Sequence, residues 1–196
     1  MTFKEYEDKI KNSLAKYVRD QSQEDRYTEL LLGLYEEAAE ITSPIRRTIK
    51  GNYHETPIDL KHLSEEVGDV LWYITHITTQ LPDGHLPGIE IRDYCDSVSE
   101  KHNPEIPTHQ HERLRYLCLG LITEVGEVSE EFGEHRINGT KLNISRIEEK
   151  LADTLWYLTS ICNTYGLDLE QIANENVEKV YSRYKTDGTL KKNYER

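Results

Sequence analysis

The sequence predicts an all-α fold built from two tandem helical repeats. Apolar residues recur three and four positions apart along most of the chain, which is the period of an α-helix. No segment shows the strict alternation that is typical of a strand. A motif that spans residues 36–73 returns 84 to 87 residues later, and such an internal duplication indicates two copies of one helical unit.

Composition limits the classes of protein that the chain can represent. Its 196 residues suffice for one domain or two small ones. The net charge of −12 argues against nucleic acid and anionic membranes as partners, since both would repel it. Residues 1–10 are charged throughout, unlike a signal peptide, and no apolar run approaches the ~20 residues that span a bilayer. Cys95, Cys118 and Cys162 form no CxxC pair, so we expect reduced thiols in a cytoplasmic protein.

The first half is expected to hold three helices. Apolar spacing predicts one helix over residues 3–19 and another over residues 27–42, which Ser43 and Pro44 should end. Residues 50–56 are polar and predict a loop. Asp59 is a candidate N-cap for a long helix that ends near residue 81.

The second half is expected to repeat this order and to add one helix. The breakers Pro82-Asp83-Gly84 and Pro87-Gly88 separate the halves, which we place at residues 1–85 and 89–196. The additional helix covers residues 169–184, with Asp168 as a candidate N-cap, and the first half has no counterpart of it. We expect each half to bury its apolar faces against the other, as a pseudo-dimer within one chain.

Four acids in the first half are spaced to share one site. Residues three apart lie on one face of a helix, so Glu37 projects with Glu40, and Glu66 projects with Asp69. Two antiparallel helices can bring both pairs together, where the carboxylates repel one another unless a cation lies between them. Oxygen ligands suit a hard ion, so we expect Mg²⁺, with Mn²⁺ as the alternative.

The pattern ExxE, a loop of variable length, and ExxD followed by Leu-Trp-Tyr resembles the MazG-like branch of the all-α nucleoside triphosphate pyrophosphohydrolases. The resemblance covers nearly the whole chain, once per half. It implies a helix bundle, commonly built from dimers, that hydrolyses an NTP or dNTP to the monophosphate and pyrophosphate with Mg²⁺. The family's metal ligands fall on Glu37, Glu40, Glu66 and Asp69, and Glu36 matches an extra acid that often precedes them. The sequence leaves open whether the chain also forms a homodimer.

Other side chains are candidates for catalysis and for substrate binding. A carboxylate that is not fully committed to the metal, Glu36 or Glu37, could accept a proton from the attacking water. The last predicted helix looks like the family's phosphate-contacting signature, Asn-x-x-Lys-x-x-x-Arg. We expect it to reach the first half's acids across the pseudo-dimer interface. The candidate substrate-binding residues are Lys50, Asn176, Lys179 and Arg183, and Arg46 and Arg47 are weaker candidates.

The second half departs from this pattern. Its candidate metal ligands are Glu124, Glu127, Glu149 and Asp153, but Lys150 stands three residues before Asp153, where an acid is expected. A positive charge there opposes a divalent ion. We therefore expect the principal site in the first half.

Other functions remain open on the sequence alone. The runner-up is a non-catalytic MazG-like protein that binds nucleotides or a partner protein, and a further alternative is hydrolysis of another pyrophosphate-linked compound. A di-iron bundle would need Glu-x-x-His motifs, which are missing, and His109 and His111 beside Pro107 suit a loop better than a zinc site. Trp72 and Trp156 are expected in the core, with a nucleobase pocket as the other interpretation.

Overall fold

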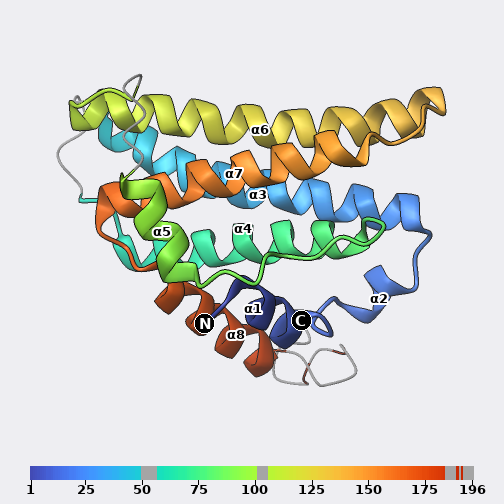
Figure 1. Ribbon diagram of the computed structural model, residues 1–196. Coiled ribbons are helices and arrows are strands. Elements are labelled where there is room, and N and C mark those ends of the chain that lie inside the picture. The colour runs from blue at the N-terminus through green and yellow to red at the C-terminus, as the bar shows by residue number, and fades with distance from the viewer. Residues whose placement is uncertain (50–56, 101–105, 184–188, 190, 192–196) are drawn as a thin grey trace.

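Four long helices form the centre of the molecule. The computed structural model describes residues 1–49, 57–100, 106–183, 189 and 191. Helices α3 (Gln23–Ile49) and α4 (Leu60–Gln80) form one hairpin, and α6 (Gln110–Asn138) and α7 (Ile144–Tyr165) form the second. The hairpins pack on each other, α3 against α6 and α4 against α7 (Figure 1). Among the described residues, β-type pairing is limited to one isolated bridge, so the prediction of an all-α tandem pseudo-dimer is confirmed.

In the described part of the chain, four shorter helices pack against this bundle or against one another. They are α1 (Phe3–Ile10), α2 (Lys16–Arg19), α5 (Ile91–Glu100) and α8 (Leu169–Arg183). Helix α8 leaves the second hairpin and packs across α4 of the first, with α1 beside it (Figure 1). Helix α5 packs against α7 and α8. The last helix of the second half therefore lies on the first half, although the division at residues 85–89 itself stays a prediction.

Two predicted helix boundaries are wrong. Residues 3–19 form two helices, because the chain turns after α1 and buries Ser13, whose hydroxyl accepts a hydrogen bond from Trp72 Nε1 at 2.8 Å. Pro44 lies inside α3 and does not end it. A helical proline costs about 3 kcal/mol, but Ile41, Ile45 and Ile49 are buried at helical spacing around it, and their packing holds the helix together.

The predicted N-caps are confirmed. The Asp59 side chain accepts hydrogen bonds from the backbone N–H groups of residues 61 and 62, and Asp168 does the same for residues 170 and 171. The apolar faces of both hairpins join in one continuous core. In the part of the chain that the structure describes, no helix is both long and apolar enough to cross a membrane.

Equivalent glycines set the spacing of the two hairpins. A Cβ atom added to Gly33 of α3 would lie 2.2 Å from the ring of Tyr73 on α4, and one added to Gly120 of α6 would lie 2.1 Å from the ring of Tyr157 on α7. In each half a tyrosine ring thus lies on the bare backbone of the facing helix. This contact fixes how closely the two helices that carry the acids approach each other.

A third glycine distinguishes the halves. A Cβ atom at Gly68 would lie 3.1 Å from the side-chain nitrogen of Asn176, because α8 crosses α4 at this point. The equivalent residue of the second half is Ala152, which is exposed. Glycine therefore stands where α8 crosses closely over α4, and alanine stands at the equivalent, exposed position of α7.

Substituting Gly33 by alanine should destabilise the protein and move the Tyr73 ring. Overpacking typically costs about 1–3 kcal/mol, and the higher helix propensity of alanine offsets part of it. Gly120→Ala should have a similar effect on the free energy of unfolding. Gly133→Ala is the control, because nothing lies within 4 Å of a Cβ atom there. Denaturant unfolding measures all three, and equal stability of the Gly33 and Gly133 variants would contradict the close approach.

Candidate functional site

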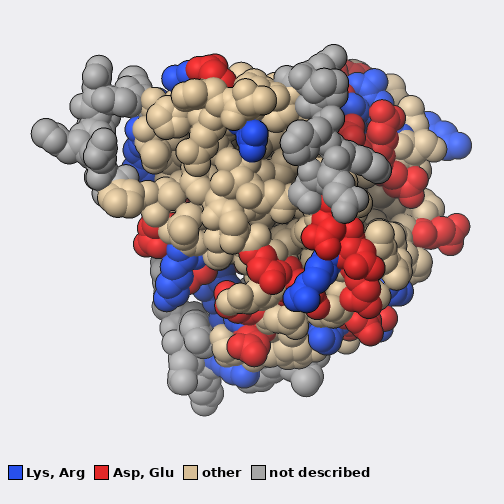
Figure 2. All heavy atoms as spheres, turned by 60° about the vertical axis from the view of Figure 1, so that its left-hand side comes forward, with Lys and Arg blue, Asp and Glu red and all other residues tan. Residues whose placement is uncertain are grey.

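The acids of the first half converge where α3 faces α4. Glu37 comes from α3, and Glu66 and Asp69 come from α4, and each offers a carboxylate oxygen within 4.8 Å of the others. Glu66 is buried, and Glu37 and Asp69 are half-buried. Figure 2 shows one end of the bundle, where acidic side chains gather in the middle and right of the face below a mostly uncharged area.

The cluster carries more negative charge than the protein can neutralise easily. Burial, followed by the interaction with Glu66 and by the negative charges of Asp69 and Glu40, raises the pKa of Glu37 to about 9. Without a cation, Glu37 therefore keeps its proton at neutral pH, since ionisation would bring another negative charge into a partly dry site. A divalent ion can replace that proton. The all-oxygen donor set fits Mg²⁺ or Mn²⁺.

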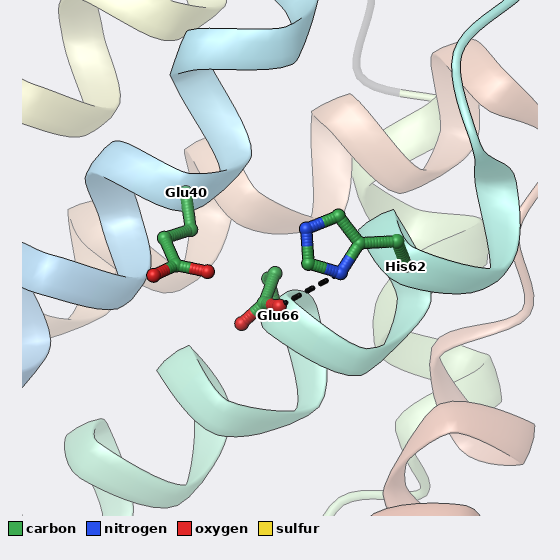
Figure 3. A group of neighbouring side chains, drawn as sticks. All are labelled: Glu40, His62 and Glu66. Atoms are coloured by element: carbon green, nitrogen blue, oxygen red, sulfur yellow. Dashed lines mark ion pairs between the residues drawn. The ribbon is translucent and has the colours of Figure 1, made fainter.

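A second group of candidate metal ligands adjoins the first and includes a histidine. Glu40, His62 and Glu66 also lie with their donor atoms within 4.8 Å of one another, and Figure 3 shows them pointing together from α3 and α4. His62 Nδ1 lies 3.0 Å from a carboxylate oxygen of Glu66. His62 was not among the candidates predicted from the sequence, although its position four residues before Glu66 places both on one face of α4.

Helix α8 supplies polar groups to the same acids. Asn176 is buried and donates a hydrogen bond of 3.0 Å from Nδ2 to Asp69, while its Oδ1 accepts one of 2.8 Å from the Tyr6 hydroxyl. Lys179 forms an ion pair with the second oxygen of Asp69. The structure thus brings two of the predicted substrate-binding residues to a predicted metal ligand. Tyr6, which anchors Asn176, was also missed, because its apolar spacing resembled that of an ordinary core residue.

A hollow of about 120 Å³ opens beside the acids. Its lining combines acids, cations and aromatic rings: Glu37, Asp69, Trp72, Tyr73, Lys179, Val180 and Arg183. Arg183 is exposed at its edge. Trp72 is half-buried, so its ring contributes both to the core and to this hollow. Groups that suit a metal ion, phosphate oxygens and a planar base therefore face one space.

The remaining first-half candidates lie outside this centre. Glu36 is exposed on α3. Arg46 and Arg47 are exposed in the last turns of α3, where Arg46 lines a different, largely apolar groove between α3 and α6. Lys50 lies outside the described residues.

The second half gathers acids around a lysine. Lys150 Nζ lies 3.2 Å from Glu124, 3.1 Å from Glu127 and 3.6 Å from Asp153. Its side chain is only 16% exposed, so it does not extend into solvent. Glu149, the remaining predicted ligand, is exposed. Lys150 takes the inner position because it stands three residues before Asp153, on the face of α7 that meets α6.

The electrostatics of the two clusters differ accordingly. The neighbouring carboxylates of Glu127 and Glu124 raise the pKa of Lys150 well above its usual value, so that it stays charged. Burial raises the pKa of Glu124, and Lys150 opposes that rise. An ammonium group compensates the acids in the second half. In the first half, Lys179 pairs with Asp69 and His62 lies beside Glu66, and Glu37 stays protonated.

Comparison with known proteins agrees with this geometry. A family model described as the MazG nucleotide pyrophosphohydrolase domain matches the chain twice, at residues 25–108 and 112–187. No curated protein and no solved structure matches the chain. The two matched segments contain the two acid clusters, one in each.

Proposed function

The chain belongs to the MazG nucleotide pyrophosphohydrolase family, and from this premise we propose that it converts an NTP or dNTP to the monophosphate and pyrophosphate with Mg²⁺. The observation that supports this most is the convergence of Glu37, Glu66 and Asp69 with Lys179 beside one hollow. A triphosphate and its counter-ion need such a combination, because the acids hold the ion and the cation contacts phosphate oxygens.

We assign the metal to Glu37, Glu40, Glu66 and Asp69, with His62 as an added neighbour. When bound, Mg²⁺ would neutralise charge on the phosphates and lower the pKa of a bound water. Mn²⁺ offers the same coordination chemistry with the same ligands. The buried Asn176 orients Asp69 toward the cluster through its hydrogen bond.

The reaction adds water across the anhydride between the α- and β-phosphates. A water oxygen forms a bond to phosphorus, the bridging P–O bond breaks, and pyrophosphate leaves. The water proton goes to a carboxylate, for which we propose Glu37 or its exposed neighbour Glu36. Glu37 can accept that proton only after a cation has displaced the one that burial holds on it. Lys179 and Arg183, four residues apart on α8, are assigned to the phosphates.

A screen of NTPs and dNTPs with Mg²⁺ tests this function. We expect at least one nucleotide to yield equal amounts of monophosphate and pyrophosphate, and EDTA to abolish the yield. Mg²⁺ at about 100 times its Kd should also stabilise the folded state by about 2.7 kcal/mol, which thermal unfolding measures.

Release of orthophosphate in place of pyrophosphate would contradict the proposed bond cleavage. Nucleotide binding without turnover would favour the non-catalytic alternative. If Mg²⁺ and Mn²⁺ change neither turnover nor unfolding, the metal assignment is wrong.

A further inference from the structure

The two halves differ at two of the positions that face the acids of the neighbouring helix. In α4 these positions hold His62 and Glu66, and the equivalent positions in α7 hold Arg146 and Lys150. The acids on the facing helix are retained in the second half. A histidine and a glutamate in one copy thus correspond to an arginine and a lysine in the other.

The helices that face these positions, α3 and α6, also differ, and here the difference is in acidic residues. Arg146 lies 3.4 Å from Glu130 and 3.0 Å from Glu131 of α6, one turn beyond the contacts of Lys150. The equivalents of these two acids on α3 are Ser43 and Pro44, which carry no charge. The second half therefore carries cations on α7 and matching acids on α6, at positions where the first half has neither.

We propose that the second acidic cluster is a metal-independent ion-pair lock between α6 and α7, so that metal binding is confined to the first half. The lock consists of Arg146 and Lys150 with the acids Glu124, Glu127, Glu130, Glu131 and Asp153. The Lys150 ammonium occupies the space between carboxylates that an ion would need. It is tethered to α7 and only 16% exposed, so an incoming ion would have to displace it and overcome its charge.

The lock has a consequence for stability without metal. Without a metal ion, Glu37 and Glu66 share one site between α3 and α4 at a cost in stability, because their charges repel unless one of them keeps a proton. The acids of the second half hold α6 to α7 whether or not an ion is present. The inference rests on the proposed function only for the first-half metal site. The lock itself can be tested in a metal-free protein.

Substitutions at the two equivalent positions should therefore have opposite effects in EDTA. Lys150→Met removes the central cation and should lower the Tm by about 5 °C, because it leaves Glu124 and Asp153 without this cation and Glu127 with Arg146 alone. Glu66→Gln removes one carboxylate from a repelling group and should raise the Tm. High salt should reduce both shifts. A Lys150→Met protein that is as stable as the wild type, or more stable, would overturn the lock.

Metal binding gives a second, independent measurement. The number of Mn²⁺ ions bound per chain, counted by electron paramagnetic resonance, should be unchanged by the pair Glu124→Gln and Asp153→Asn. The pair Glu66→Gln and Asp69→Asn should lose all bound Mn²⁺. Loss of ions in the first pair would show that the second cluster binds metal and would overturn the inference. If the wild type binds no Mn²⁺, the proposed function fails, and the EDTA measurement still decides the lock.

A charge reversal completes the test. Arg146→His and Lys150→Glu together reproduce the first-half pattern in α7. When Glu66→Gln and Asp69→Asn have removed the first-half metal site, these two substitutions in α7 should restore Mn²⁺ binding. A folded variant that binds none would show that the two cations are not what excludes the metal. If the reversed protein does not fold, the two preceding measurements decide.

Discussion

Asp69→Asn should remove nearly all pyrophosphate release, and Asp153→Asn should remove little of it. Asp69 belongs to the cluster with Glu37 and Glu66. It also accepts a hydrogen bond from Asn176 and forms an ion pair with Lys179, both on α8. The amide removes one negative charge from the proposed ligand set while keeping the size of the side chain. Removal of a group that only orients a metal ligand typically lowers metal affinity or activity by about 10–100-fold. Removal of a ligand itself should therefore lower kcat/KM by more than about 100-fold.

Asp153 occupies the equivalent position but lies beside Lys150, so its replacement should change kcat/KM by less than about 3-fold. The comparison uses steady-state kinetics of both variants with saturating Mg²⁺, after unfolding has shown that each is folded. Inactivity of the Asp153 variant alone would make the second half catalytic. Equal loss in both would indicate two working sites.

Acidification should unfold the protein partly through one buried histidine. His76 is 2% exposed, packs against the Trp72 ring and lies 3.2 Å from the Ser13 hydroxyl, and burial lowers its pKa to about 3. An unfolded histidine binds a proton below about pH 6.5. Unfolding therefore takes up a proton between about pH 6.5 and pH 3, and the stability that the neutral ring contributes is lost as the pH falls through that window. The upper limit is about 5 kcal/mol.

His76→Gln isolates this contribution. The variant lacks the titrating ring, so its free energy of unfolding should fall less steeply than that of the wild type between pH 6.5 and pH 4. Urea unfolding at each pH measures the difference in slope, which does not depend on how much the substitution costs at pH 7. His111→Asn, at an exposed position, is the control and should keep the wild-type slope. Parallel curves for wild type and His76→Gln would show that the ring gains a proton without unfolding.

Some features that the sequence left undecided depend on distances between helices. Helix α3 continues through Pro44, because three buried isoleucines hold it there, and local rules alone would end it. The roles of Tyr6 and His62 were hidden for a similar reason. Each side chain fits an ordinary helical pattern. Its role is visible only where another helix packs beside it and brings Asn176 to Tyr6, or Glu40 to His62.

The sequence by itself determined the helical class, the duplication and the pairing of acids along each helix. These follow from periodicity and from spacing within one element, which are local properties of the chain. It also marked Lys150 as the residue that distinguishes the halves. Only the tertiary structure decided that this ammonium stays among three carboxylates and does not extend into water. It also decided that α8 crosses to α4 at Gly68, because packing between segments about 100 residues apart depends on shapes that neither segment carries alone.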